Sequence, residues 1–304
     1  MQIVLIGQAA FGAKMLEKLI ETGEEVVGVF TPPDIKGRPN PLREEAARRG
    51  APVFWHKGKW TLDIYEAFAK LNPELNVMAF VTSILPEFII NYPEYGTIQY
   101  HPSLLPRHRG GSAINWAIIN GETKTGVTIF WPDKGIDTGP ILLQKETPIA
   151  PDDTVGALYF NKLFPLGVEA VIESVRLVKE GKAPRIAQDE TQATYEGRCT
   201  EKNTAIDWRL PAQEVYNLIR GSNPQPCAST YFGSIRFKVF DSELLAGQSS
   251  RPGEIVEIND RGFIVAAKGG SILVKRVQAE DLPKISAREL VEEVGLKVGD
   301  TLGI

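Results

Sequence analysis

The stretch Thr97–Ser112, which reads TIQYHPSLLPRHRGGS, decides the interpretation of this chain. Its first residues are largely apolar and predict the end of a buried strand, and residues 112–119 predict a helix soon after it. The loop between them holds two of the three histidines, with two arginines, two prolines and two glycines. Open α/β sheets place their sites at the carboxyl ends of strands. We therefore expect His101 to point into a site, although a surface-loop histidine is the alternative.

The sequence around this stretch alternates short apolar runs with helical periods. It opens with an apolar run at residues 2–6, the string GQAAFG, a helical period and a second apolar run at residues 25–30. This order implies a parallel, right-handed crossover, and its repetition predicts a doubly wound, Rossmann-like α/β fold with a mostly parallel sheet. GQAAFG has two glycines instead of three, and no acidic residue ends the second run, so a tight packing turn is favoured over an NAD site.

The pattern changes at about residue 204. After a helical period at residues 211–220, five or so short β-type runs follow with turn residues between them, which predicts a smaller β-barrel, OB-like in type. Thr154 is expected to cap a long helix that reaches about residue 179. We therefore expect a catalytic α/β domain at residues 1–180, a linker at 181–203 and a β-barrel domain at 204–304.

The composition excludes several classes of protein. The 304 residues carry a net charge of −4, so no global field draws the chain to nucleic acid or anionic lipid. No apolar run approaches the ~18 residues that span a bilayer. The two cysteines, Cys199 and Cys227, lack metal-ligand spacing, as do the three histidines. We expect a cytoplasmic protein without a metal or a membrane, and nucleic acid is disfavoured as a partner.

The pair His101 and Asp137 is the strongest candidate for chemistry. The two residues are distant in sequence, but adjacent loops of one sheet can bring them together. An imidazolium can donate to a developing oxyanion, and a carboxylate can orient it or take a proton from water or an amine. Covalent catalysis is disfavoured because the sequence has no GxSxG elbow and neither cysteine lies beside a histidine.

Several motifs resemble one known family. HPSLLPRHRG, SAINW directly after its glycines, and DKGIDTGP at Asp133–Pro140 resemble the 10-formyltetrahydrofolate-dependent formyltransferases and hydrolases. The strings VFTPPD, ATYEG and AIDW extend the resemblance over most of the chain. Within the family, IQYHPSLLPRHRG, TIFW, LLQKE and ATYEG are most similar to the amino-terminal hydrolase domain of 10-formyltetrahydrofolate dehydrogenase.

The resemblance implies a catalytic trio of Asn, His and Asp. His101 and Asp137 match it, whereas Gln99 stands at the Asn position; the hydrolase branch also lacks the Asn there. Gln99 keeps a carboxamide that can donate to the formyl oxygen but adds a methylene, and a strand residue without a catalytic role is the alternative. The implied folate-binding residues border one crevice and are Phe80, Ser83, Leu85, Pro86, Leu104, Leu105, Arg107, Asp133, Gly135 and Tyr195.

The implied substrate is 10-formyltetrahydrofolate, with no metal and no NAD in this chain. Hydrolysis to tetrahydrofolate and formate is the leading hypothesis: His101 stabilises the oxyanion and Asp137 orients or deprotonates a water. Transfer of the formyl group to an amine, on methionyl-tRNA or an amino-sugar nucleotide, is an alternative, and a non-catalytic folate-binding module is another.

Two features bear on the partners. The segment at residues 31–43 is short, with Lys36, Arg38 and Arg43 as its only cations, which argues against tRNA. The dehydrogenases of the family continue into carrier-protein and aldehyde-dehydrogenase domains. These domains are expected partners if the chain is part of a longer protein.

Overall fold

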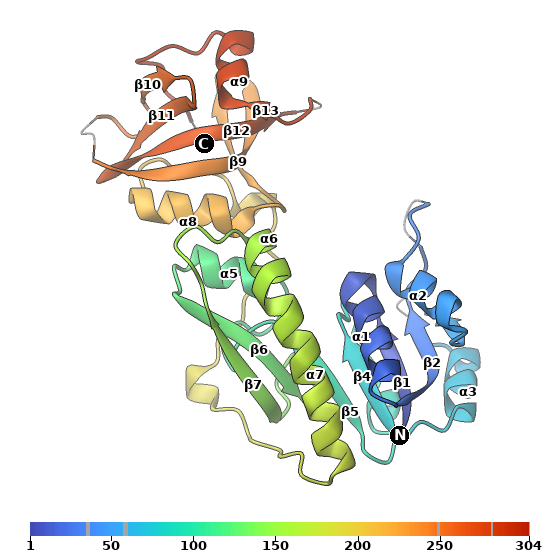
Figure 1. Cartoon of the computed structure of the whole chain (residues 1–304). Coiled ribbons are helices and arrows are strands. Elements are labelled where there is room, and N and C mark those ends of the chain that lie inside the picture. The colour runs from blue at the N-terminus through green and yellow to red at the C-terminus, as the bar shows by residue number, and fades with distance from the viewer. Residues whose placement is uncertain (35–36, 57–59, 248–249, 281, 304) are drawn as a thin grey trace. The chain divides into compact units, whose positions relative to one another are not determined.

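The computed structural model describes residues 1–34, 37–56, 60–247, 250–280 and 282–303. Lys36, one of the cations noted above, lies outside these residues. The chain forms two compact units, and each is described by itself (Figure 1). The first unit contains Met1–Gly110, Gly126–Thr147 and Asn161–Tyr195. The second unit contains Gly111–Thr125, Pro148–Phe160 and Glu196–Ile304.

The first unit is built on a seven-stranded sheet with the order β3-β2-β1-β4-β5-β6-β7. Strands β1 to β5 pair in parallel, and β6 runs antiparallel to β5. The chain moves outward from β1 to β3 and then returns to place β4 on the other side of β1, which makes the sheet doubly wound. The predicted α/β class is confirmed. The strands are β1 (Gln2–Gly7), β2 (Glu25–Thr31), β3 (Val53–Trp55), β4 (Leu75–Ala79), β5 (Thr97–His101), β6 (Lys124–Phe130) and β7 (Ile141–Pro148).

Helices accompany this sheet, and aromatic contacts show which way β5 faces. Tyr100 of β5 stacks on Phe11 of α1 with ring centroids 4.3 Å apart. Successive strand residues point to opposite faces, so Gln99 and His101 point away from α1. The helices of the first unit are α1 (Ala9–Glu21), α2 (Pro41–Arg49), α3 (Leu62–Lys70), α4 (Glu87–Ile90) and α7 (Phe164–Lys179).

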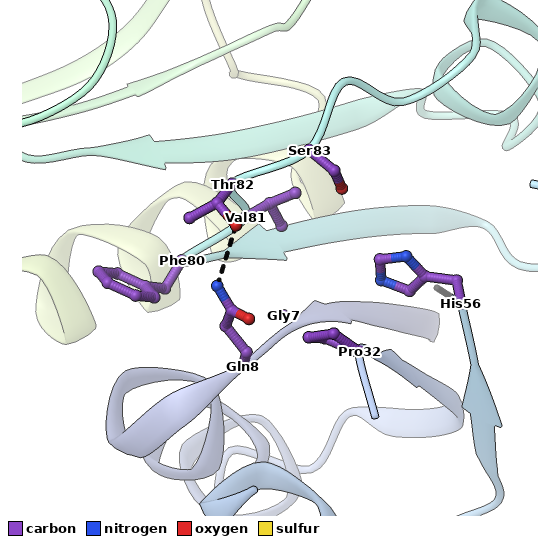
Figure 2. A pocket seen from close by; sticks show the side chains of 8 residues that line it. All are labelled: Gly7, Gln8, Pro32, His56, Phe80, Val81, Thr82 and Ser83. Carbon is purple, nitrogen blue, oxygen red and sulfur yellow. Dashed lines mark hydrogen bonds between the residues drawn. The ribbon is translucent and has the colours of Figure 1, made fainter. Parts of the chain in front are cut away.

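Gly7 allows β1 to approach β4 closely. A Cβ on Gly7 would lie 2.3 Å from the carbonyl oxygen of Ala79, which no side chain can accept. A Cβ on Gly12 would meet the side chain of Leu42 in α2 at 3.0 Å. Both glycines of GQAAFG therefore serve close packing, and the end of β1 lies beside the loop that follows β4 (Figure 2).

The predicted long helix is present and begins at Thr154, whose hydroxyl accepts a hydrogen bond from the Ala157 N–H at 3.2 Å. It comprises α6 (Val155–Leu158), a π-helical turn (Tyr159–Leu163) and α7. By length and composition, Val155–Lys179 could cross a membrane, in contrast to the expectation from uninterrupted apolar runs. Glu169 and Glu173 of α7 pair with Lys145 of β7 at 2.6 and 2.8 Å. These ion pairs are typical of a helix packed on a sheet.

The second unit contains a six-stranded antiparallel sheet with the order β10-β11-β12-β9-β8, and β13 pairs with β12. Gly303 bridges to Tyr231 of β8, and Thr301 bridges to Glu254 beside β10. The C-terminal residues therefore link the two edge strands, as in a barrel. The strands are β8 (Ala228–Phe232), β9 (Ile235–Ala246), β10 (Ile255–Asn259), β11 (Gly262–Ala267), β12 (Gly270–Ala279) and β13 (Ile285–Ser286), accompanied by α5 (Ala113–Ile119), α8 (Ala212–Ser222) and α9 (Ala287–Val294).

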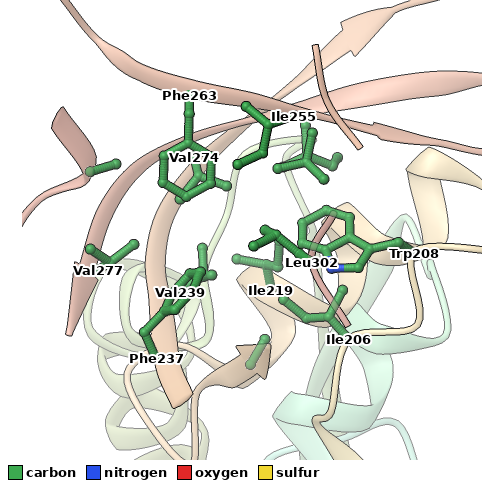
Figure 3. Packing of buried hydrophobic residues seen from close by; sticks show 14 of the residues in the cluster. Ile206, Trp208, Ile219, Phe237, Val239, Ile255, Phe263, Val274, Val277 and Leu302 are labelled. Atoms are coloured by element: carbon green, nitrogen blue, oxygen red, sulfur yellow. The ribbon is translucent and has the colours of Figure 1, made fainter. Parts of the chain in front are cut away.

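An apolar core fills this unit, with Phe237, Phe263 and Trp208 among its fully or nearly fully buried side chains (Figure 3). The indole N–H of Trp208 donates to the Thr230 hydroxyl at 3.0 Å, so the burial of the ring leaves no polar group unpaired. A large core of this kind explains how a domain of short strands is stable.

Each compact unit is assembled from several separate stretches of the chain. Residues 111–125 and 148–160 belong to the second unit although they fall within the predicted 1–180 domain. The amide of Asn115 in α5 donates to the carbonyl oxygens of Gly221 and Gln225. The Arg220 guanidinium donates to the Asp153 carbonyl oxygen at 3.0 Å. Such long-range polar contacts leave no periodic signal in the sequence.

Candidate active site

Strand β5 carries His101 to the carboxyl edge of the first unit's sheet. Gln99 is the register partner of Met78 in β4. Phe80 and His101 each lie two residues beyond that pair, so they leave neighbouring strands at about the same level, and adjacent strands are about 4.8 Å apart. Gln99 and His101 share one face of β5. The carboxamide of Gln99 and the imidazole of His101 can therefore reach the same reacting group.

The imidazole of His101 is 5% exposed and lies between two oxygen atoms. Its Nε2 is 2.8 Å from the carbonyl oxygen of His108. A carbonyl oxygen only accepts, so this contact places a proton on Nε2. Its Nδ1 is 3.6 Å from Oδ2 of Asp137, beyond the usual hydrogen-bond range. Catalytic hydrogen bonds are often long before substrate binds. The structure thus brings His101 and Asp137 together, with Nδ1 as the ring nitrogen that faces the carboxylate.

Asp137 is held by its own backbone and by a turn. It is 9% exposed and has φ = +55°, a left-handed conformation that costs energy for a residue with a Cβ. The Gly110 N–H donates to Asp137 Oδ2 at 2.8 Å. Earlier in the loop, the Asp133 carboxylate accepts hydrogen bonds from the Gly135 N–H at 2.9 Å and the Thr138 hydroxyl at 2.6 Å. Asp133 thus shapes the turn that presents Asp137.

Gln188 fixes the backbone of Asp137 and was not expected from the sequence. Its side-chain amide donates to the carbonyl oxygens of Asp137 at 2.9 Å and Gly139 at 2.7 Å. A Cβ on Gly139 would lie 1.8 Å from the Trp131 carbonyl oxygen, so the loop has no room to shift there. Gln188 belongs to the segment treated as a linker in the sequence, where nothing but its polarity is visible.

Arg109 extends this network toward the surface. Its buried guanidinium donates to the Gln188 side-chain oxygen at 2.8 and 3.1 Å and to Glu190 at 2.7 and 2.9 Å. Hydrogen bonding to the Glu190 carboxylate raises the pKa of Arg109, and the same bonds lower the pKa of Glu190. Since Arg109 holds Gln188, and Gln188 holds the backbone of Asp137, two side chains in series fix one catalytic candidate.

A second group of contacts holds the loop directly after His101. Thr128 of β6 is the register partner of His101, and its hydroxyl donates to the Ser103 carbonyl oxygen at 2.6 Å. The same hydroxyl accepts from the Leu105 N–H and from the Gln144 amide. Thr128 and Gln144 belong to the strings TIFW and LLQKE, so the family resemblance was the signal that could have identified them.

The expected folate-binding residues lie in different environments. Leu85 and Leu105 are buried in apolar clusters, so they support the loops and expose almost no surface. Pro86 precedes α4 as its N-cap residue. Phe80, with φ = +62°, and Ser83 line a pocket. Five others are partly or largely exposed: Leu104, Arg107, Asp133, Gly135 and Tyr195, the last of which bridges to Arg109.

That pocket has a volume of about 120 Å³ and lies at the carboxyl ends of β1, β2, β3 and β4 (Figure 2). His101 and Asp137 are not among its lining residues. We place the chemistry at His101 and Asp137, because facing acid–base groups are there, and treat the pocket as a separate hollow one strand away. Among the described residues, no group of three or more His, Cys, Asp or Glu is arranged to hold a metal ion.

Comparison with known proteins identifies similar chains. The family model described as Formyl transferase matches residues 1–175, and that described as Formyl transferase, C-terminal domain, matches residues 198–294. Mitochondrial 10-formyltetrahydrofolate dehydrogenase of Homo sapiens is 43% identical over 304 residues, which cover 95% of this chain and 33% of that protein. Methionyl-tRNA formyltransferase of Geotalea uraniireducens is 35% identical, with 100% and 98% covered. The chain thus spans about one third of the length of the dehydrogenases that it matches.

Solved structures share the fold. HypX from Aquifex aeolicus in complex with tetrahydrofolic acid has a TM-score of 0.71 at 18% identity, covering 98% of this chain and 48% of that one. The N-formyltransferase from Helicobacter canadensis, in complex with folinic acid and dTDP-3-aminofucose, has a TM-score of 0.70 at 20% identity, covering 90% and 98%. At these identities the likeness extends to the fold alone.

Proposed function

Because the chain belongs to the formyl transferase family, we propose that this enzyme hydrolyses 10-formyltetrahydrofolate to tetrahydrofolate and formate. The observation that carries the proposal is the approach of His101 Nδ1 to Asp137 Oδ2, 3.6 Å apart at the carboxyl edge of the sheet. Two proton-handling groups that face each other there can act on one carbonyl group and its attacking water. The 43% identity to a 10-formyltetrahydrofolate dehydrogenase supports the choice of substrate.

The reaction follows from the positions of these groups. Water attacks the formyl carbon, and the carbonyl electrons move to oxygen to form a tetrahedral oxyanion. Asp137 takes the proton of the attacking water. The oxyanion accepts hydrogen bonds from the Gln99 carboxamide and from Nδ1–H of a His101 imidazolium, whose Nε2–H stays on the His108 carbonyl oxygen. Collapse of the intermediate breaks the bond between carbon and nitrogen, and the folate nitrogen takes the proton that Asp137 removed from the water. The formic acid so formed releases its remaining proton to solvent. The products are formate and tetrahydrofolate.

The hydrogen bonds around His101 and Asp137 fix both side chains in position before the reaction. His108 holds the Nε2 side of the imidazole, so the ring cannot rotate freely. Gly110 and Gln188 hold the side chain and the backbone of Asp137. Groups fixed before the reaction need little reorganisation when charge develops, which is how such sites lower the barrier.

The test is the release of tetrahydrofolate and formate from 10-formyltetrahydrofolate by the purified chain, without any amine acceptor. We expect turnover by the wild type and its loss in both His101→Ala and Asp137→Asn. Both variants must keep the circular dichroism spectrum and melting temperature of the wild type. Folded wild-type protein without turnover above the spontaneous rate would exclude hydrolysis.

A second candidate function is formyl transfer to an amine. The chain covers 98% of the length of a methionyl-tRNA formyltransferase at 35% identity, which supports this alternative. An amine would take the place of water, and Asp137 would accept its proton. Incubation with methionyl-tRNA or with an amino-sugar nucleotide distinguishes the two: acceptor-dependent release of tetrahydrofolate, with a formylated product, favours transfer over hydrolysis.

A further inference from the structure

The pocket beside the candidate active site has the dimensions of one ring. Its volume is about 120 Å³, and cavities of about 150 Å³ accommodate a benzene molecule. It lies where the order of strands reverses between β1 and β4, the position at which doubly wound sheets bind ligands. The pocket is therefore suited in size and place to a single ring.

The lining of the pocket carries no formal charge at neutral pH. Its polar groups are the Gln8 carboxamide, the hydroxyls of Thr82 and Ser83, and the imidazole of His56. Burial lowers the pKa of His56, which keeps the imidazole neutral. Phosphate, carboxylate and ammonium groups would find no counter-ion among these residues. An occupant of matching chemistry is neutral and offers hydrogen-bond donors and acceptors.

His56 contributes a buried polar atom that has no partner. The residue is 3% exposed, and its Nδ1 makes no hydrogen bond within the part of the chain that the structure describes. Its backbone is nevertheless fixed, since the His56 N–H donates to the Thr31 carbonyl oxygen at 3.2 Å. Unpaired buried polar atoms are costly and rare in native proteins. Figure 2 shows the imidazole and Pro32 on one side of the hollow and Gln8 with Val81 and Thr82 on the other.

The imidazole also ends an aromatic stack. His56 stacks on Trp60 with ring centroids 5.4 Å apart, Trp60 on Phe30 at 5.3 Å, and Phe30 on Phe54 at 4.8 Å. Trp60 does not line the pocket, so the pocket reaches the imidazole from another side. A planar ring in the pocket would therefore meet this stack at the imidazole of His56, which also carries the unpaired Nδ1.

We propose that this pocket binds one neutral, planar nitrogen heterocycle of six-membered ring size, held by a hydrogen bond to His56 Nδ1. The Gln8 carboxamide donates to the Thr82 hydroxyl at 3.3 Å, which leaves its oxygen as an acceptor for a ring N–H. The ligand class follows from size, neutrality and the unpaired nitrogen. It does not depend on the reaction at His101, so the two proposals can fail separately.

Uracil is the probe, because it is one neutral six-membered ring with lactam donors and acceptors. Titration of the full chain, labelled with 15N in its histidines, should shift the His56 ring nitrogens saturably, with a dissociation constant on the order of 1 mM. Orotate, the same ring with a carboxylate, should bind at least tenfold more weakly. No saturable shift, or equal affinity for orotate, would overturn the proposal.

Variants assign the site. His56→Phe keeps a ring and removes its nitrogens, so uracil affinity measured by saturation transfer should fall at least tenfold. His56→Asn places a polar atom near Nδ1 and should retain more affinity than the phenylalanine variant. Trp60→Phe is the matched control, since it keeps an aromatic ring in the stack and loses only the unpaired indole N–H, and its affinity should stay within threefold of wild type. Equal affinity in His56→Phe and wild type contradicts the assignment.

Discussion

Two histidines lie at the carboxyl edge of one sheet, His56 after β3 and His101 at the end of β5, and their surroundings differ. The imidazole of His101, at the end of β5, lies between a carbonyl oxygen at 2.8 Å and a carboxylate oxygen at 3.6 Å. The imidazole of His56, after β3, has an aromatic neighbour and an unpaired Nδ1. Both residues are at least 95% buried. Burial alone therefore does not distinguish them, whereas their hydrogen-bond partners do.

The different partners of the two imidazoles suit them to different roles, proton transfer at His101 and ligand binding at His56. A histidine that faces a carboxylate can exchange a proton with substrate and be restored by its partner. A neutral histidine without a charged neighbour has no such cycle, but it can recognise a ligand through one hydrogen bond. We propose that the same residue type serves two roles on one sheet edge, and four changes test that assignment.

The largest effect is expected for Asp137→Asn. The change keeps the shape of the side chain and the hydrogen bond from Gly110, but removes the group that accepts a proton. We expect the rate of formate release to fall by about 10³-fold or more, in the range seen when a member of a catalytic group is lost. Asp260→Asn, at an exposed position, is the matched control and should retain full activity. Activity of Asp137→Asn within tenfold of wild type would show that the carboxylate is not the base.

Gln99→Leu is expected to have the next largest effect. Leucine removes the carboxamide and leaves the strand pairing of β5 intact, because backbone groups make it. Loss of one oxyanion donor typically costs about 10²–10³-fold in kcat, and we expect about 10²-fold here with little change in KM. Gln192→Leu, at an exposed glutamine, serves as the control. An unchanged kcat would assign Gln99 to the strand alone.

Gln188→Ala should have a smaller effect, because Gln188 acts through Asp137. The variant loses the two hydrogen bonds that hold the carbonyl oxygens of Asp137 and Gly139. We expect kcat to fall by about 10-fold, since small misplacements of catalytic groups are costly, while KM changes little. Gln188→Glu cannot donate and should not restore activity. If Gln188→Ala instead lowers the melting temperature and leaves kcat unchanged, the role of Gln188 is structural only.

Much of the first unit could be predicted because its signals are local. Apolar runs place β1 and β2 within one residue of the expected bounds, and the doubly wound order follows from the alternation of apolar runs with helical periods. The facing of His101 and Asp137 follows from the rule that sites lie at the carboxyl ends of strands. The strand β13 has only two residues, which is too short for an alternating apolar pattern to be recognised in the sequence.

The supporting residues could not be predicted for a physical reason. Gln188 is about fifty residues along the chain from Asp137, and a glutamine in a polar segment has the same appearance whether or not it binds a loop. The pocket at His56 is likewise assembled from the ends of four strands, of which only the loop after β4 was expected to bind ligand. Sequence patterns identify which residues belong to elements, and packing decides which loop ends meet.

The smallest effect concerns the stability of His56 against acid. Burial lowers the folded-state pKa of His56 below about 6.5, its value in an unfolded chain. As the pH falls through that value, the unfolded chain binds a proton that the folded chain does not, so the free energy of unfolding decreases, by at most about 1.4 kcal/mol per pH unit. His56→Phe has no such proton, so its free energy of unfolding should decline less than that of wild type between pH 7.5 and 5.5. Urea denaturation at several pH values measures this difference, with Trp60→Phe as the control that keeps the histidine. Parallel curves for wild type and His56→Phe would mean that the imidazole takes up a proton equally in both states, in conflict with a neutral pocket.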